Sequence, residues 1–166
     1  MRYWDIFESE LGPIKVVCDD EGVLGVEFNR EEPKEGQQKT TELTKKTTEL
    51  TKKTVHQLRE YLSGERTEFD LPLKPQGTEF QKKVWEALLT IPYGQTRSYK
   101  EIAVQIGNEK ACRAVGMANN RNPISIIIPC HRVVGADKSL VGYGGGLNIK
   151  VKLLNMECPG VTWKNY

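Results

Sequence analysis

The chain has 166 residues, of which 38% are hydrophobic, so it can bury one good core or two small cores joined by a linker. Its net charge of +2 conceals an asymmetry: residues 1–75 carry 12 Lys and Arg against 16 Asp and Glu, whereas residues 76–166 carry 12 against 6. The two parts are therefore charged −4 and +6, which indicates that the second part faces a polyanion. No segment has the apolar length of a membrane span or the apolar core of a signal peptide, so we expect a soluble, cytoplasmic protein that binds no membrane.

The cysteine and histidine content argues against a metal site. The four cysteines include no C-x-x-C pair, and the only histidines are His56 and His131. A structural zinc site needs ligands that lie closer together in the sequence. We therefore expect no metal and no cofactor, and we interpret Cys18 and Cys112 as small buried residues.

Three short segments near the amino terminus are rich in aromatic and β-branched residues. They are Tyr3 to Phe7, Ile14 to Cys18 and Val23 to Phe28. Gly, Pro and Asp residues separate them, which predicts an antiparallel meander. The polar residues 29–38 that follow predict a surface loop.

The segment TTELTKK occurs twice in succession, at residues 40–46 and 47–53. One such repeat is too short for a solenoid. Its leucines share a helical face with later apolar residues, namely Leu43, Leu50, Val55, Leu58, Tyr61 and Leu62. This periodicity predicts one amphipathic helix that starts near Leu43 and ends at Ser63 and Gly64, with His56 exposed or at the edge of the core.

The proline-bearing residues 69–77 form the best linker in the chain, so we expect two domains, 1–75 and 76–166. Thr78 with Gln81 has the pattern of a capping box and predicts a helix through Leu89. Its buried side should carry Val84, Trp85, Leu88 and Leu89.

Ser98 with Glu101 is a second capping box and predicts a short helix that carries Ile102, Ala103 and Ile106. Gly107 and Asn108 interrupt the chain before a further helix over residues 109–118. Two helices across a tight turn are typical of a helix-turn-helix, although many helical proteins contain such a corner. A last helix is predicted from Leu147 to Glu157, followed by a frayed tail in which Trp163 docks locally.

A site for chemistry is indicated where the apolar run of residues 124–128 ends at Pro129 and delivers Cys130 beside His131. A free thiol with a pKa of about 8.5 is only slightly ionised at neutral pH, so it becomes a nucleophile when a base activates it. Neighbouring side chains on a strand point to opposite faces. Cys130 and His131 can therefore interact only if the backbone turns there or a water bridges them. Pro129 makes such a break plausible.

Residues 140–146 form a glycine-rich loop that lacks the spacing of a phosphate-binding P-loop. Glycines instead allow the backbone to approach a flat ligand closely.

Three ordered motifs, RAVGMANNRNP (residues 113–123), IPCHRV (128–133) and YGGGLNIK (143–150), resemble the 6-O-alkylguanine-DNA alkyltransferases. The resemblance covers most of residues 76–158. It implies an α+β protein with a small ribonuclease-H-like α/β amino-terminal domain and a mainly helical carboxy-terminal domain that contains a winged helix-turn-helix.

The resemblance implies roles for single residues. Cys130 would accept the alkyl group, His131 would deprotonate it through a water, Glu157 would orient His131, and Asn122 would tie this network together. Tyr99 would hydrogen-bond the base at N3. Further pocket residues would be Tyr143, Gly144, Gly145 and Lys150. Asn119 stands where some family members carry larger residues, which bears on the size of alkyl group that is accepted.

The resemblance also implies a DNA-binding surface. Arg113 would fill the space that a flipped nucleotide vacates, from a helix in the minor groove, and the small residues Ala114 and Gly116 would let that helix approach the DNA. Gln81, Lys100 and Asn108 align with positions that touch the DNA backbone. The expected partner is double-stranded DNA with alkylated bases, bound by a monomer.

The function implied is direct-reversal DNA repair: irreversible, single-turnover transfer of methyl from 6-O-methylguanine, and from 4-O-methylthymine, to Cys130. Two alternatives stay open. The first is a non-catalytic lesion sensor like the alkyltransferase-like proteins, which carry tryptophan at the position of Cys130. The second, more distant, is a Cys-His hydrolase of acyl substrates, which would turn over many times.

Overall fold

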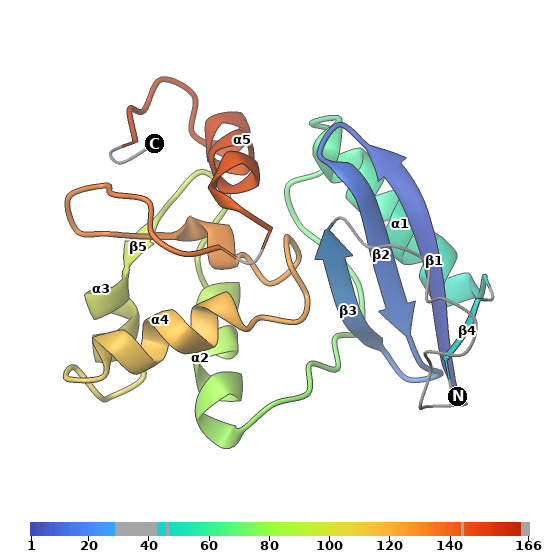
Figure 1. Cartoon of the computed structure of the whole chain (residues 1–166), viewed down its shortest axis with the longest axis horizontal. Helices are drawn as coiled ribbons and strands as arrows, with labels where there is room; N and C mark the ends of the chain where they lie inside the picture. Colours follow the sequence, from blue (N-terminus) through green and yellow to red (C-terminus); the bar gives the residue numbers. More distant parts are fainter. Residues whose placement is uncertain (29–42, 46, 144, 164–166) are drawn as a thin grey trace. The chain divides into compact units, whose positions relative to one another are not determined.

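The computed structural model describes residues 1–28, 43–45, 47–143 and 145–163. The chain forms two compact units, Met1–Pro75 and Gln76–Tyr166 (Figure 1). None of the helices in the described ranges is both long and apolar enough to span a bilayer.

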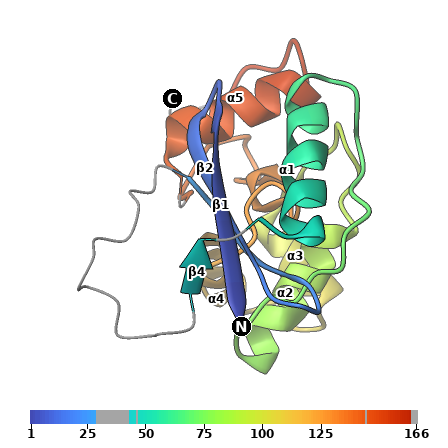
Figure 2. The same ribbon diagram turned by 90° about the vertical axis from the view of Figure 1, so that its right-hand side faces the viewer.

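The first unit is a four-stranded sheet with one helix packed on it. The strands are β1 (Arg2–Ser9), β2 (Gly12–Cys18), β3 (Val23–Phe28) and β4 (Leu43–Lys45), in the order β3-β2-β1-β4. The first three pair antiparallel, as the meander predicted, and β4 joins the edge of β1 in parallel. Helix α1 (Glu49–Leu62) packs against β1, β2 and β3 (Figures 1 and 2). The predicted loop at residues 29–38 lies outside the described residues.

The prediction of one helix starting near Leu43 is wrong. Within the first copy of the repeat, Leu43 to Lys45 form β4, and α1 begins inside the second copy. Thr48 is its N-cap, and the side chains of Thr48 and Thr51 form a reciprocal capping box. Edge pairing with β1 therefore overrides local periodicity in the first copy, whereas a cap starts a helix in the second. His56, with a side chain 74% exposed, lies on the surface as expected.

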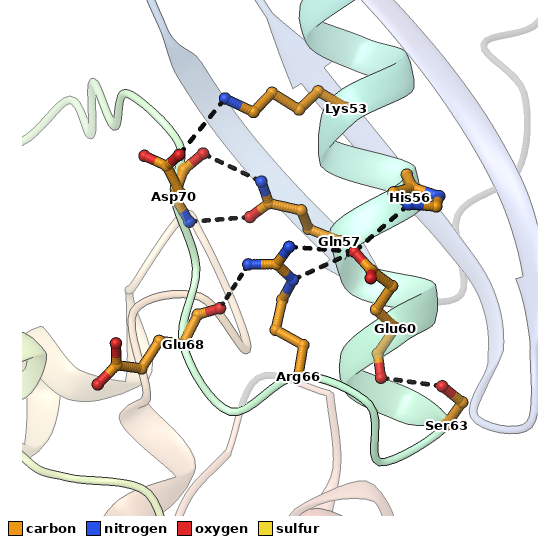
Figure 3. Close-up of polar contacts among 8 residues, drawn as sticks. All are labelled: Lys53, His56, Gln57, Glu60, Ser63, Arg66, Glu68 and Asp70. Carbon is orange, nitrogen blue, oxygen red and sulfur yellow. Dashed lines mark hydrogen bonds and ion pairs between the residues drawn. The ribbon is translucent and has the colours of Figure 1, made fainter.

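The segment that looked like a linker is fastened to the first unit as far as Lys74. The backbone of Asp70 exchanges two hydrogen bonds with the side chain of Gln57 on α1, at 2.9 and 3.1 Å, and Arg66 pairs with Glu60 of α1 at 3.1 Å (Figure 3). Further along, Lys74 Nζ lies 2.7 Å from Asp19 Oδ2. These contacts hold the extended chain against the edge of the first unit.

The second unit is mainly helical. It contains α2 (Glu79–Leu89), α3 (Tyr99–Gln105), α4 (Cys112–Asn120) and α5 (Leu147–Glu157), with a 3₁₀ turn, η1 (Cys130–Arg132). Two short strands, β5 (Arg97–Ser98) and β6 (Val133–Val134), pair in parallel. Both predicted capping boxes start their helices, and α5 has its predicted bounds. Trp163 packs against the apolar cluster around α5, as expected.

Two details of this unit differ from the predictions. Leu89 is 48% exposed, because Ala87 rather than Leu89 completes the buried side of α2. Helix α4 begins at Cys112 rather than near residue 109, and its N-cap Ala111 has no side chain that could accept a capping hydrogen bond. The sequence therefore offers no capping residue that marks the start of α4.

Candidate active site

The apolar run before Cys130 is a compact turn and not a strand. Ile126, within it, has φ 72°, a conformation that a β-branched residue adopts only under strain, at a cost of about 1–3 kcal/mol. Asn122 holds the turn closed: its Nδ2 donates to the carbonyl oxygens of Ile128 (2.7 Å) and Ile124 (3.3 Å), and its Oδ1 accepts from the Ile124 N–H (3.0 Å). The side chain of Asn122 therefore determines the path by which the chain reaches Cys130.

The chain turns again at Cys130, which begins η1, and then continues into β6. The parallel pairing of Arg97 with Val133 and of Ser98 with Val134 brings β6 beside β5. Because β5 leads directly into α3, this pairing places Tyr99, the first residue of α3, near the turn that carries Cys130.

His131 and Arg132 both bind Glu157 at the end of α5. His131 Nε2 lies 2.8 Å from Glu157 Oε2, and Arg132 donates from Nε to Oε1 (2.6 Å) and from Nη2 to Oε2 (3.1 Å). All three residues are buried. Burial alone would raise the pKa of the Glu157 carboxyl, but the hydrogen bonds and charges of His131 and Arg132 outweigh it and lower this pKa to about 2. Glu157 is therefore an anion at neutral pH.

This anion fixes the state of the imidazole. An ionised carboxylate only accepts hydrogen bonds, so Nε2 carries the ring hydrogen and Nδ1 presents a lone pair. Burial lowers the pKa of His131 below its ordinary value, although the hydrogen bond and charge of Glu157 act in the opposite direction. His131 is thus a neutral base with a defined tautomer.

Cys130 is 3% exposed. Burial raises the pKa of its thiol to about 11, and the hydrogen bond from Asn122 and the charge of Lys150 offset only part of that effect. The sulfur is therefore protonated in the resting protein. It needs a base to become a nucleophile, and the neutral imidazole of the next residue is the base that the fold supplies.

Lys150 ties α5 to β6 and to the start of the glycine-rich loop. It is fully buried, and its Nζ donates to the carbonyl oxygens of Val133 (2.7 Å), Val141 (3.3 Å) and Gly142 (3.5 Å). Burial lowers the pKa of Lys150 to about 8, and a negative charge on Cys130 acts against this. Lys150 is thus the cation whose charge most directly favours a thiolate at Cys130.

The Tyr99 hydroxyl donates to the Val141 carbonyl oxygen at 2.8 Å, the same oxygen that Lys150 reaches. Tyr143 is 8% exposed and Gly145 is partly buried, whereas Gly144 lies outside the described residues. The side chains predicted for catalysis are thus joined through shared hydrogen bonds, charges and backbone segments, all within the second unit.

Most of the residues predicted to contact DNA are exposed, and one of them, Gly116, packs against Tyr99 of this network. Four of them are exposed: Arg113 and Ala114 on α4, Lys100 on α3, and Asn108 shortly after α3. Gly116 faces Tyr99, because a Cβ built on it would lie 3.7 Å from the Tyr99 ring. Gln81 is partly occupied within its own helix, since its Oε1 accepts the N–H of Thr78 in the capping box.

Sequence reasoning missed the structural part played by Arg132 and Asn119. Arg132 clamps Glu157 and also donates from Nη1 to the Ile91 carbonyl oxygen (2.7 Å), and Asn119 donates to the Cys130 carbonyl oxygen (3.2 Å). Arg132 and Glu157 are 25 residues apart, so no spacing rule connects them. The need for Arg132 appears only once Glu157 is known to be buried beside a neutral histidine, because a buried carboxylate requires a cation.

Within the described ranges, no group of three or more His, Cys, Asp and Glu side chains is arranged to hold a metal ion.

Comparison with known proteins gives consistent matches over both units. Residues 2–75 match the family model described as "6-O-methylguanine DNA methyltransferase, ribonuclease-like domain", and residues 79–158 match "6-O-methylguanine DNA methyltransferase, DNA binding domain". A methylated-DNA–protein-cysteine methyltransferase of Methanosarcina acetivorans is 51% identical over 155 residues, which are 93% of this chain and 97% of that protein. A protein of the same name from Mycobacterium leprae is 64% identical over 103 residues, 62% of each chain.

Solved structures agree. The crystal structure of Mycobacterium tuberculosis O6-methylguanine methyltransferase matches with a TM-score of 0.84 and 44% identity, over 98% of this chain and 96% of that one. The structure of Mycobacterium tuberculosis OGT in complex with DNA matches with a TM-score of 0.83 and 45% identity, over 93% and 92% of the two chains. The similarity thus extends over both units of the chain.

Proposed function

Because this chain belongs to the 6-O-methylguanine DNA methyltransferase family, we propose that it repairs DNA directly, by transferring the methyl group of 6-O-methylguanine to its own Cys130. The observation that carries the proposal is the buried arrangement of Cys130, neutral His131 and the Glu157–Arg132 pair. That arrangement supplies a nucleophile, a base of fixed tautomer and a charge that stabilises the protonated base.

In the proposed reaction, His131 Nδ1 takes the thiol proton of Cys130 through a water, and the resulting imidazolium is stabilised by Glu157. The thiolate attacks the methyl carbon, the bond between that carbon and guanine O6 breaks, and the electron pair passes into the guanine ring. Tyr99 donates a hydrogen bond to N3 of the base, so the leaving group does not carry a full negative charge. The charge of Lys150 favours the thiolate.

The product fixes the number of turnovers. A thioester can be hydrolysed, but the S-methyl thioether formed here has no carbonyl for water or a thiol to attack. Each protein molecule therefore acts once. The same attack is open to 4-O-methylthymine, which presents an equivalent alkyl carbon.

The sulfur of Cys130, a residue that is only 3% exposed, cannot reach a base stacked in a duplex, so the nucleotide must be flipped out, at a cost of about a few kcal/mol. In this proposal, exposed Arg113 fills the vacated space, and Ala114 and Gly116 let α4 approach the minor groove. Lys100, Asn108 and Gln81 contact the DNA backbone. The excess of positive charge in residues 76–166 supports this orientation of the interface.

The substrate pocket of this proposal is built from Tyr99, Tyr143, Gly145 and Lys150, together with Gly144. In this proposal the second unit, residues 76–166, carries both the chemistry and the DNA contacts. The protein acts as a monomer, because one flipped base needs one sulfur. It acts on DNA inside the cell.

The test is to incubate the protein with duplex DNA that contains one 6-O-methylguanine and to measure the mass of the intact protein. The proposal predicts one added methyl group in the parent and in Cys158→Ala, a control at another cysteine of the same unit, and none in Cys130→Ala. A parent protein that binds the lesion but keeps its mass would overturn the proposal and identify a lesion sensor instead.

A further inference from the structure

The last turn of α4 presents a buried amide to the Cys130 turn. Asn119 is 1% exposed, and its Nδ2 donates to the carbonyl oxygen of Cys130 at 3.2 Å. The orientation of the amide follows from chemistry, because only its NH₂ group can donate to a carbonyl. The preceding residue is also anchored, since Trp85 Nε1 on α2 donates to the Ala118 carbonyl oxygen at 2.9 Å. Asn119 is thus held firmly against the peptide that joins Cys130 to His131.

Two buried acceptors beside this peptide, Asn119 Oδ1 and His131 Nδ1, have no hydrogen-bonding partner among the residues that the structure describes. The ring hydrogen of His131 is on Nε2, facing ionised Glu157, so Nδ1 can only accept. Neither atom can satisfy the other, because both are acceptors. Folded proteins rarely leave buried acceptors unmatched, and one water can offer a hydrogen to each of two acceptors.

We propose that Asn119 is a positioning residue for methyl transfer: its Oδ1 accepts one hydrogen of the water that links Cys130 to His131. The other hydrogen of that water points to His131 Nδ1, and its oxygen accepts the thiol hydrogen of Cys130. A buried water needs two to four polar partners, and these three groups provide them. The inference rests on the proposed function. It assigns to Asn119 the orientation of the water through which His131 deprotonates Cys130.

The proton transfer balances without another reactant. The S–H bond of Cys130 breaks and its proton moves to the water oxygen, while the proton that faces His131 Nδ1 moves to the imidazole. The hydrogen held by Asn119 stays in place, so the water is regenerated. The sulfur keeps the electron pair with which it attacks the methyl carbon. Asn119 therefore acts by keeping a hydrogen, and not a lone pair, directed at the base.

Other titratable and charged groups also face this centre. Lys150 from α5 and Tyr99 from α3 interact with Cys130, and Glu157 from α5 and Arg132 from η1 interact with His131. All four are retained in the variants below. A difference between variants at Asn119 therefore reports on the amide and not on these charges.

Two substitutions of similar shape separate the hydrogen-bonding role from packing. Asn119→Leu keeps the volume and removes both polar atoms. Asn119→Asp, when protonated, reproduces the amide pattern, because its O–H donates to the Cys130 carbonyl and its other oxygen accepts. In single-turnover transfer from methylated duplex DNA, we expect Asn119→Leu to be slower by roughly tenfold or more, because the water is no longer oriented toward the general base. Asn119→Asp should approach the parent rate at acidic pH, where burial helps to keep its carboxyl protonated, and slow down as the pH rises and the carboxyl ionises.

The exposed neighbour provides a matched control, so Asn120→Leu should transfer at the parent rate. A double-mutant cycle separates positioning from general disruption. In a His131→Ala background the water has no base to serve, and Asn119→Leu should then change the rate less than about twofold. Thermal unfolding and affinity for methylated duplex DNA are measured for every variant, and we expect both to stay close to the parent values.

Several outcomes would overturn the inference: an unchanged rate in Asn119→Leu, a folded Asn119→Asp that is slow at acidic pH, or losses that simply add in the His131→Ala background. If Asn119→Leu does not fold, the pH profile of Asn119→Asp decides alone. Alkylation of Cys130 by iodoacetamide, followed by peptide mass mapping, tests the same role without DNA. If the parent protein transfers no methyl group, the proposed function is wrong. The iodoacetamide measurement would still test the role of Asn119, because it uses no methylated DNA.

Discussion

Glu157 binds a permanent cation, Arg132, and a neutral imidazole, His131, at the same time. Arg132 holds both oxygens, at 2.6 and 3.1 Å, and His131 holds one of them at 2.8 Å. Arg132 keeps Glu157 charged, and its own charge disfavours a second cation at His131. The imidazole is consequently neutral at rest, yet its positive form has a counter-ion in place.

Replacing the carboxylate tests this arrangement. Glu157→Gln leaves Arg132 buried without its anion, so we expect a loss of about 3–5 kcal/mol in the free energy of unfolding and a much slower transfer of methyl. Urea titration and single-turnover kinetics measure the two effects. Glu86→Gln, at an exposed position on α2, is the control and should change neither.

The same carboxylate predicts a pH dependence of stability. The pKa of Glu157 falls from 4.5 to about 2 on folding, so its contribution, about 3 kcal/mol, is present above the unfolded value and is lost as the pH falls from 4.5 toward 2. The difference in unfolding free energy between the parent and Glu157→Gln should therefore shrink across this window. A difference that stays constant down to pH 2 would contradict the assigned charge.

Lys150 offers a second test at the scale of one residue. Its charge lowers the pKa of Cys130, so Lys150→Met should raise the pH at which iodoacetamide alkylates Cys130. Peptide mapping follows this cysteine separately from Cys18, Cys112 and Cys158. Alkylation of Cys130 at an unchanged pH would show that the buried ammonium serves only to hold the Val133 and Val141 carbonyls.

The first residues of the helices show which element boundaries could be predicted from the sequence. Thr78 and Ser98 carry capping side chains, and the helices after them begin where the sequence predicts. Ala111 has none, and the predicted start of α4 was about three residues early. The turn in the apolar run before Cys130 could not be predicted, because it depends on Asn122 binding the Ile124 and Ile128 carbonyls, which apolar spacing does not reveal.

The cap of α3 is predicted to matter for function as well as for stability. Ser98→Ala removes the hydrogen bond to the Glu101 N–H and should cost about 1 kcal/mol of unfolding free energy. Because Tyr99 is the next residue, transfer should also slow down. Thr48→Ala, in the corresponding capping box of α1, should cost a similar amount of stability and leave the transfer rate unchanged. Equal transfer rates in the two variants would show that the α3 cap does not determine the position of Tyr99.

At the scale of the whole molecule, the charge difference between the two units agrees with their parts in the proposal. The unit that contains the sulfur carries the positive excess, and the exposed residues predicted to contact DNA belong to it. The sequence could predict this division because charge and motif content change together near residue 75. It could not predict that residues 69–74 are fastened to the first unit, since those contacts join distant side chains and backbone, such as Gln57 and Asp70.

Arg113 tests the assignment of the DNA surface. Arg113→Ala should slow transfer from 6-O-methylguanine in duplex DNA by a large factor and leave transfer from the free modified base nearly unchanged, because only the duplex must be held open. Lys52→Ala, at an exposed lysine of the first unit, is the control for lost charge and should affect neither. Equal losses on both substrates would remove the role proposed for Arg113.

The central claim is that one particular sulfur, buried beside a neutral imidazole, keeps the methyl group permanently. The most direct measurement exposes the protein to an excess of methylated duplex DNA, digests it, and locates the added methyl among Cys18, Cys112, Cys130 and Cys158. The account predicts one methyl group per protein molecule, on Cys130 alone, with no further transfer afterwards. Methyl on another cysteine, or continued consumption of methylated DNA, would contradict it.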